Sequence, residues 1–194
     1  MTATAIGSGK ARSGEDVTVV TARDSSSLTP AVRKQLSAIK GQVVVAVPLN
    51  AGDWTTIARA TPSPIVRLTP AGPTSAGAQQ VVAATKAILA ANPRARVEWV
   101  VPIDADPDTI ANASSAAKVV DTIAVTIPAD AHWPRTMRDL TDWTTWASAH
   151  RKRVSVVQQV DATTRPGLVR SVNDWIGVQA KSRRIAYSAT TTQN

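Results

Sequence analysis

The chain has 194 residues, a formal net charge of +8 and 43% hydrophobic residues. This length suits a single domain with its own core. No apolar run approaches the roughly 18 residues that a membrane-spanning helix needs, so we expect no membrane span. The absence of cysteine excludes disulfides and zinc–thiolate sites. With only two histidines as well, we expect neither a bound metal nor a cofactor.

The N-terminal segment MTATAIGSGKARSGED has no apolar stretch of the length found in secretory signals. We therefore expect a cytoplasmic or virion-associated protein. The GSGK sequence at 7–10 does not fit a phosphate-binding loop. Thr4 stands where that pattern needs glycine, and Ala11 stands where it needs serine or threonine.

Short β-branched runs alternate along the chain with longer alanine-rich stretches. Thr29-Pro30 and Asp106-Pro107 each place a capping residue before a proline, which is typical of a helix start. Several of the apolar runs are nearly continuous, as in strands buried on both faces. The predicted strands are 17–22, 42–49, 64–68, 96–101, 122–127, 154–160 and 184–189, and the predicted helices are 29–40, 52–60, 75–92, 107–119, 136–150 and 165–180.

Regular alternation of this kind predicts an α/β fold, a small single-domain (β/α)8 barrel of the TIM type. Residues 2–6 would supply the eighth strand, with a loop at 7–16 in place of the first helix. Otherwise residues 1–16 would be a flexible arm, followed by a barrel domain over 17–194. The alternative is a doubly wound parallel sheet, although no glycine-rich phosphate turn follows a strand.

Four segments occur in an order and spacing that resemble the β-mannanase-type family 26 of retaining glycoside hydrolases. They are PIVRLTPAGP (64–73), NPRARVEW (92–99), DTIAVTIP (121–128) and WTTWASAHRKR (143–153). The resemblance covers about residues 42–190 and implies a barrel with two catalytic glutamates at the ends of its strands. It places the general acid/base at Ala71 and the nucleophile at Gln158.

Neither residue can perform the chemistry of that family. A retaining glycosidase needs two carboxyl groups about 5–5.5 Å apart, one to attack the sugar and one to protonate the leaving oxygen. Alanine at 71 offers neither function, and glutamine at 158 keeps the shape of glutamate without its charge. The sequence therefore favours a protein that does not cleave sugars.

Residues at the expected C-terminal mouth of the barrel could still bind a sugar. Sugars stack their C–H faces on tryptophan and bond polar side chains through their hydroxyls. Three aspartates of the mouth could also replace the missing acids, although a role in a turn or helix cap explains each of them better. The predicted ligand-binding residues are Trp54, Arg67, Asp104, Asp130, His132, Trp133, Gln158 and Asp161.

Three functions follow from these observations. The first is a catalytically inactive, carbohydrate-binding barrel whose partner is a polysaccharide or cell-wall glycan. The second is a structural or assembly protein with protein partners, for example a component of a phage virion. The third is a glycosidase that uses Asp104, Asp130 or Asp161. The basic runs at 151–153 and 181–184 come without any nucleic-acid-binding motif, so nucleic acid is not an expected partner.

Overall fold

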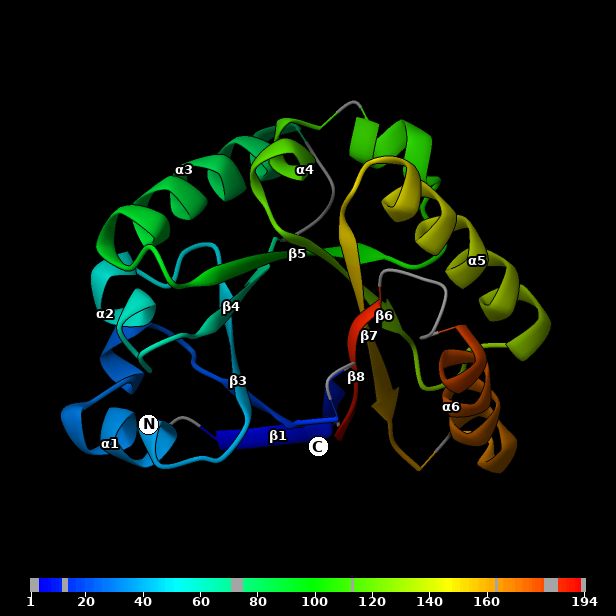
Figure 1. Ribbon diagram of the computed structural model, residues 1–194, viewed down its shortest axis with the longest axis horizontal. Coiled ribbons are helices and arrows are strands. Elements are labelled where there is room, and N and C mark those ends of the chain that lie inside the picture. The colour runs from blue at the N-terminus through cyan, green and yellow to red at the C-terminus, as the bar shows by residue number, and fades with distance from the viewer. Residues whose placement is uncertain are drawn as a thin grey trace.

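Eight strands form one closed barrel in the computed structural model, which describes residues 4–11, 14–70, 75–112, 114–162, 164–179 and 185–192. Each strand pairs with the next one in sequence, and β8 pairs back with β1 (Figure 1). The strands are β1 (Thr4–Ala11), β2 (Asp16–Thr21), β3 (Gln42–Pro48), β4 (Ile65–Thr69), β5 (Arg96–Pro102), β6 (Thr122–Ile127), β7 (Arg153–Val160) and β8 (Ile185–Thr192).

The barrel is mixed, which corrects the fold class expected from the sequence. The seven strands β2 to β8 run parallel to one another, but β1 runs antiparallel to both β2 and β8. β1 ends at Ala11 and β2 starts at Asp16, which leaves no room for a helix between them. The prediction of an α/β (β/α)8 TIM-type barrel is therefore wrong. The doubly wound alternative is wrong too, because the sheet closes on itself.

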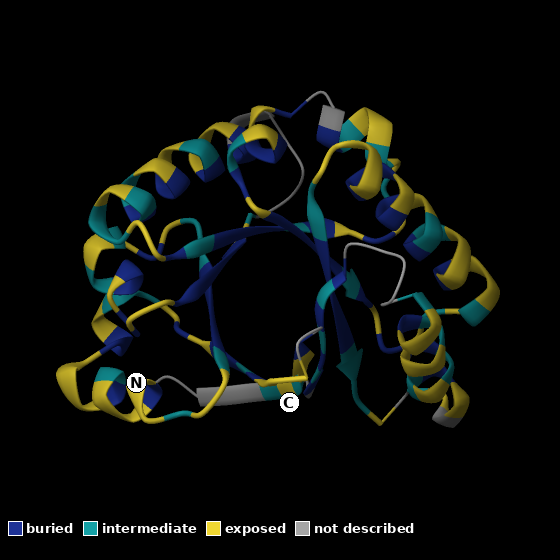
Figure 2. Ribbon diagram, in the orientation of Figure 1, coloured by how far each residue is buried: buried dark blue, intermediate teal, exposed yellow. Residues whose placement is uncertain are grey.

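Helices lie outside the barrel wall, in an arc that leaves β1 uncovered (Figure 1). Their inner sides are buried and their outer sides exposed (Figure 2). No described helix is both long and apolar enough to span a bilayer. The helices are α1 (Pro30–Ser37), α2 (Trp54–Ala58), α3 (Ser75–Ala91), α4 (Ser115–Val119), α5 (Trp133–Ala149) and α6 (Pro166–Gln179), with a three-residue 3-10 turn η1 (Ser25–Ser27) and a π-turn η2 (Asp108–Asn112).

Alternate residues of each strand face opposite sides of the wall. On β3, Val43, Val45 and Val47 belong to the large core between the strands and the helices, which we call the outer core. Val44 and Ala46 belong to a second core inside the barrel, together with residues of β2, β4 and β8. Continuous apolar strands such as QVVVAVP are thus explained by burial on both faces.

Two glycines of β1 let the strand approach β8 closely. A Cβ added to Gly9 would lie 1.8 Å from the Ser188 backbone oxygen, and one added to Gly7 would lie 2.4 Å from that of Thr190. The GSGK sequence therefore lies within a strand of the barrel wall. β1 is longer than the 2–6 strand expected from the sequence.

Helix starts follow the local signals. The Thr29 side chain accepts a hydrogen bond from the Val32 backbone N–H at the start of α1. Asp106 accepts bonds from the backbone N–H groups of Asp108 and Thr109, so it does cap a helical turn. The helix expected at 107–119 is broken, however, into η2 and α4.

Candidate functional site

A pocket of about 570 Å³ opens at the C-terminal mouth, the end of the barrel where the seven parallel strands finish. Its walls combine apolar and polar groups. Every strand from β2 to β8 contributes to it. The lining residues are Thr21, Ala46, Val47, Pro48, Arg67, Thr69, Pro70, Val100, Val101, Pro102, Thr126, Val157, Gln159 and Thr191.

Arg67 is the only charged residue among the described residues that line the pocket. It is buried on β4, where Glu98 of β5 is its partner in the strand register. The Arg67 guanidinium donates from Nε (3.2 Å) and Nη2 (3.3 Å) to Glu98 Oε2. Nη2 also donates to the hydroxyl of Tyr187 on β8.

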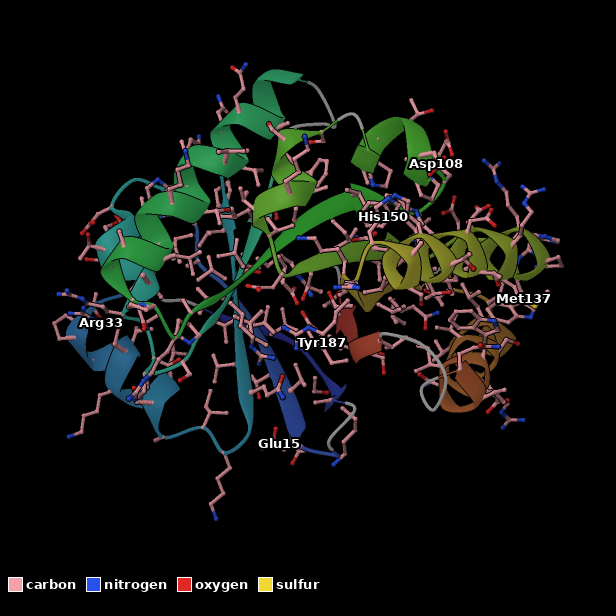
Figure 3. The ribbon with its side chains drawn as sticks, turned by 45° about the horizontal axis from the view of Figure 1, so that its top comes forward. Glu15, Arg33, Asp108, Met137, His150 and Tyr187 are labelled. Carbon is pink, nitrogen blue, oxygen red and sulfur yellow. The ribbon has the colours of Figure 1, made fainter. Side chains whose placement is uncertain are left out.

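Tyr187 completes a three-residue polar cluster inside the barrel. Its hydroxyl donates to Glu98 Oε2 at 2.7 Å, and the Arg67 guanidinium carbon lies 5.8 Å from the centre of its ring. Figure 3 places the Tyr187 label among the strands of the barrel and away from the outer helices. All three residues are buried, so the cluster fixes the Arg67 side chain below the pocket.

Burial and charge shape the ionisation of this cluster. Burial, and after it the neighbouring Glu98 carboxylate, raises the pKa of Tyr187 far above its ordinary value, although the Arg67 charge opposes the change. Burial alone would lower the pKa of Arg67, but Tyr187 and Glu98 outweigh it and raise that pKa. Arg67 is therefore a permanent cation, and Tyr187 stays a neutral hydroxyl.

The rim of the pocket carries hydroxyl and amide groups. Thr21, Thr69, Thr126 and Thr191 come from four different strands, and Gln159 comes from a fifth. The apolar side chains of β3, β5 and β7 complete the wall. Such a pocket can bond several hydroxyl or carbonyl groups of one small ligand while covering its apolar faces.

Gln158, the predicted ligand residue on β7, does not line the pocket. Val154 and Val156 precede it at alternate positions and belong to the outer core, so Gln158 faces the helices. It is buried, and its side-chain nitrogen has no hydrogen-bond partner in the part of the chain that the structure describes. Its neighbour Gln159 faces the barrel interior and lines the pocket.

The other aromatic and histidine candidates also lie outside the pocket lining. Trp54, at the start of α2, and Trp133, at the start of α5, are half-buried and pack against the outer core. His132 is the exposed N-cap residue of α5. Of the eight predicted ligand-binding residues, only Arg67 is in contact with the pocket.

The three candidate acids lie in the connections around the mouth. Asp104 is exposed and forms an ion pair with Arg135 at 3.7 Å. Asp130 is exposed after β6, and Asp161 accepts a hydrogen bond from the Thr164 hydroxyl after β7. None of them lines the pocket. Ala71, the expected acid/base position, lies outside the described residues.

Comparisons with protein-family models, curated proteins and solved structures gave no match. The resemblance to glycoside hydrolase family 26 thus rests on the sequence motifs alone.

Several motif residues behind that resemblance have structural roles. The Asn92 side chain donates to the backbone oxygens of Ala58 (2.7 Å) and Pro62 (3.4 Å), which ties the end of α3 to the end of α2. Trp143 is fully buried and donates its indole N–H to the Ile103 carbonyl at 3.0 Å. Trp146 packs beside Trp143 and stacks on His150. Asn92 thus joins two helices, and Trp143 joins α5 to the segment that follows β5.

The sequence interpretation missed Glu98, Tyr187, Gln159 and the threonines of the rim. Glu98 is one of only two glutamates in the chain, and it interrupts an apolar strand at an inward-facing position. A lone acid in a strand that is otherwise buried needs a cation beside it. That pattern, together with Arg67 in the preceding strand, could have predicted the pair.

Proposed function

We propose that the protein binds a single small, hydroxyl-rich ligand, of the size of one sugar unit, at the C-terminal mouth and does not cleave it. The observation that carries this proposal is the pocket itself, whose volume lies in the range of small-molecule sites. Its threonine hydroxyls, its Gln159 amide and its buried arginine converge on one space.

Arg67 is suited to orient such a ligand. Its Nε and Nη2 atoms are held by Glu98 and Tyr187, and Nη1 makes no hydrogen bond to a described residue. Nη1 is therefore the atom left to donate to a ligand hydroxyl or carbonyl oxygen. Because the cluster already fixes the guanidinium, ordering that side chain on binding costs little entropy.

Binding without cleavage follows from the carboxylates. Among the described residues that line the pocket there is no aspartate or glutamate. Glu98 is the strand partner of Arg67, which lines the pocket. However, the Glu98 Oε2 atom already accepts three hydrogen bonds, and its side chain is 1% exposed. A carboxylate so engaged cannot reach an anomeric carbon as a nucleophile.

The ligand class is smaller than the polysaccharide expected from the sequence. Stacking on a flat glycan chain needs exposed tryptophan faces, yet Trp99, Trp143 and Trp146 are buried in the outer core. Trp54, Trp133 and Trp175 pack against the same core. We therefore propose recognition of one unit by hydrogen bonds and not of an extended chain by stacking.

The test uses two neighbouring glutamines as a matched pair. Isothermal titration against a panel of neutral and acidic monosaccharides would be run on the native protein, Gln159→Leu and Gln158→Leu. We expect one sugar class to bind the native protein and Gln158→Leu alike, and Gln159→Leu to bind it at least about tenfold more weakly, as for a lost pair of ligand hydrogen bonds.

Three results would count against the proposal. If Gln159→Leu binds the sugar as tightly as the native protein, the pocket is not the binding site. Release of reducing sugar from any substrate would contradict a purely binding role. If no sugar binds while the protein forms defined oligomers or co-purifies with particles, the assembly function would replace it.

A further inference from the structure

The charges of this chain are separated along the barrel axis. Seven aspartates lie in the connections at the C-terminal mouth, where the parallel strands lead into the helices: Asp24, Asp53, Asp104, Asp106, Asp108, Asp130 and Asp161. Arg23, Arg135, Arg138 and Arg165 also lie near this mouth, but the aspartates outnumber them. The opposite end, where the helices lead back into the strands, carries nine cations and three acids among the described residues. Negative charge is therefore in slight excess at the mouth, and positive charge is in clear excess at the other end.

We name this second end the basic face. Its cations come from the β1–β2 hairpin and from the turns that lead into β3, β4, β5, β6 and β7. They are Lys10, Lys40, Arg59, Arg94, Arg96, Lys118, Arg151, Lys152 and Arg153. The acids at this end are Glu15, Asp16 and Asp121, so positive charge is in clear excess.

Most of these cations are unneutralised. Among the described residues of the basic face, only Lys10 forms an ion pair, with Asp16 at 2.6 Å. Lys40, Arg94 and Lys118 are exposed. Lys152 donates to the carbonyls of Lys118 and Val120 and so closes the end of α4. The exposed side chains of Lys40, Arg94 and Lys118 are available to an external anion.

The centre of the basic face holds two arginines of like charge. Arg96 and Arg153 occupy inward-facing positions at the starts of β5 and β7, and both are half-buried. Burial and the nearby Arg153 charge lower the pKa of Arg96, although Glu98 and Asp121 oppose this. The Arg96 Nη2 atom donates to a neutral group, Gln42 Oε1, at 3.1 Å. Because Arg153 places a like charge near Arg96, an anion bound here would stabilise both arginines, in addition to the Glu98 and Asp121 carboxylates that already act on Arg96.

We infer that the basic face binds the phosphate backbone of a nucleic acid without reading its sequence. Five of the nine cations are arginines, whose planar guanidinium matches the two free oxygens of a phosphodiester. The described parts of this face are the β1–β2 hairpin and the turns that lead into the parallel strands, and no described helix of eight or more residues begins there to enter a groove. The contacts available are therefore to phosphate. Because a polyanion repels the aspartates of the mouth, the barrel would bind it with the basic face toward the polymer. This inference does not depend on the sugar pocket at the other end.

The sequence had argued against nucleic acid because it contains no recognition motif. That argument addresses base readout only. Phosphate binding needs no motif, because it depends on where the fold brings the cations together. Cations that are scattered over residues 10–153 meet at one face only through the barrel topology.

The test measures duplex binding as a function of salt. Fluorescence anisotropy with two unrelated 20-base-pair duplexes would compare the native protein with the variant Lys40→Gln/Arg94→Gln/Lys118→Gln. A control variant, Arg135→Gln/Arg138→Gln/Arg165→Gln, removes the same net charge near the acidic mouth. We expect equal affinity for the two duplexes, a steep loss of affinity with salt, and at least about tenfold weaker binding with a shallower salt slope only in the first variant.

Each other outcome would overturn the inference. Equal loss of duplex affinity in both variants would mean that binding depends on the net charge of the protein and not on the basic face. Clear preference for one duplex would mean base readout. Binding to heparin or to vesicles with acidic lipid at a salt concentration that abolishes duplex binding would assign the face to a different polyanion or to a membrane surface. Circular dichroism of both variants checks that they are folded.

Discussion

Arg67 and Glu98 face each other across β4 and β5 as an ion pair inside the barrel, with the Tyr187 hydroxyl bonded to both. Their side chains are only 6% and 1% exposed. A buried charge is costly unless its partner is present, so each residue depends on the other. The pair is at once a structural element of the barrel and the support of the pocket floor.

Removing one partner should therefore destabilise the protein more than removing both. Arg67→Met leaves the Glu98 carboxylate buried and unpaired, and we expect it to lower the free energy of unfolding by about 3–5 kcal/mol. Arg67→Met/Glu98→Leu should lose clearly less than the sum of the two single changes. Denaturant unfolding followed by tryptophan fluorescence measures all four proteins. Additive losses would show that the two side chains are not coupled.

Tyr187 is the only tyrosine in the chain, so its ionisation can be followed directly. Burial raises its pKa above the ordinary value of 10.0. The folded state therefore keeps the phenol proton where the unfolded chain loses it. The stability that this gives is complete below about pH 10 and is lost as the pH rises above it. Ultraviolet absorbance should show no tyrosinate in the native protein at pH 10 to 11, and clear tyrosinate in denaturant.

Tyr187→Phe provides the control for that experiment. It removes the hydroxyl that bonds Glu98 and Arg67, and we expect a loss of about 1–3 kcal/mol near neutral pH. The variant should lose less further stability between pH 9 and 11 than the native protein does. A native tyrosine that titrates normally would mean that its hydroxyl is open to water.

The sequence predicted the positions of the strands well. It did not predict how β1 closes the barrel. Apolar, β-branched runs mark β3 to β7 because both faces of these strands are buried. The direction of β1 was not predictable from such a pattern. It depends on the short hairpin and on Gly7 and Gly9, which allow close contact with β8. Regular alternation therefore suggested a parallel barrel that the structure does not have.

The site was harder to predict than the fold because β-strand residues change face at every step. Arg67 was identified because the Arg67-Leu68 pair matched the pattern of the family that the sequence resembles. Gln158 was chosen in place of Gln159, and a shift of one residue turns the side chain from the pocket to the outer core. The tryptophans attracted attention as sugar-stacking groups, but in a chain without phenylalanine they fill the core.

Gln158 offers a stability prediction of its own. Its side-chain nitrogen is buried without a partner among the described residues, which costs about 1–3 kcal/mol for a buried amide. Gln158→Leu, close in size and without that donor, should leave the unfolding free energy unchanged or raise it by about 1 kcal/mol. Urea unfolding measures the change. A loss above about 2 kcal/mol would mean that the amide makes a bond that stabilises the native state.

Gly9 and Gly177 should respond in opposite directions to the same substitution. A Cβ on Gly9 would lie 1.8 Å from the Ser188 oxygen, so Gly9→Ala must push β1 away from β8 and break the barrel closure. We expect a loss of more than about 3 kcal/mol, or failure to fold. Gly177 lies in α6, where an added Cβ would meet no described atom within 4 Å apart from its chain neighbours and its own helix backbone, so Gly177→Ala should raise stability by about 0.5–1 kcal/mol. Thermal unfolding of both variants tests this contrast, and a tolerated Gly9→Ala would show that β1 is not held against β8 at this position.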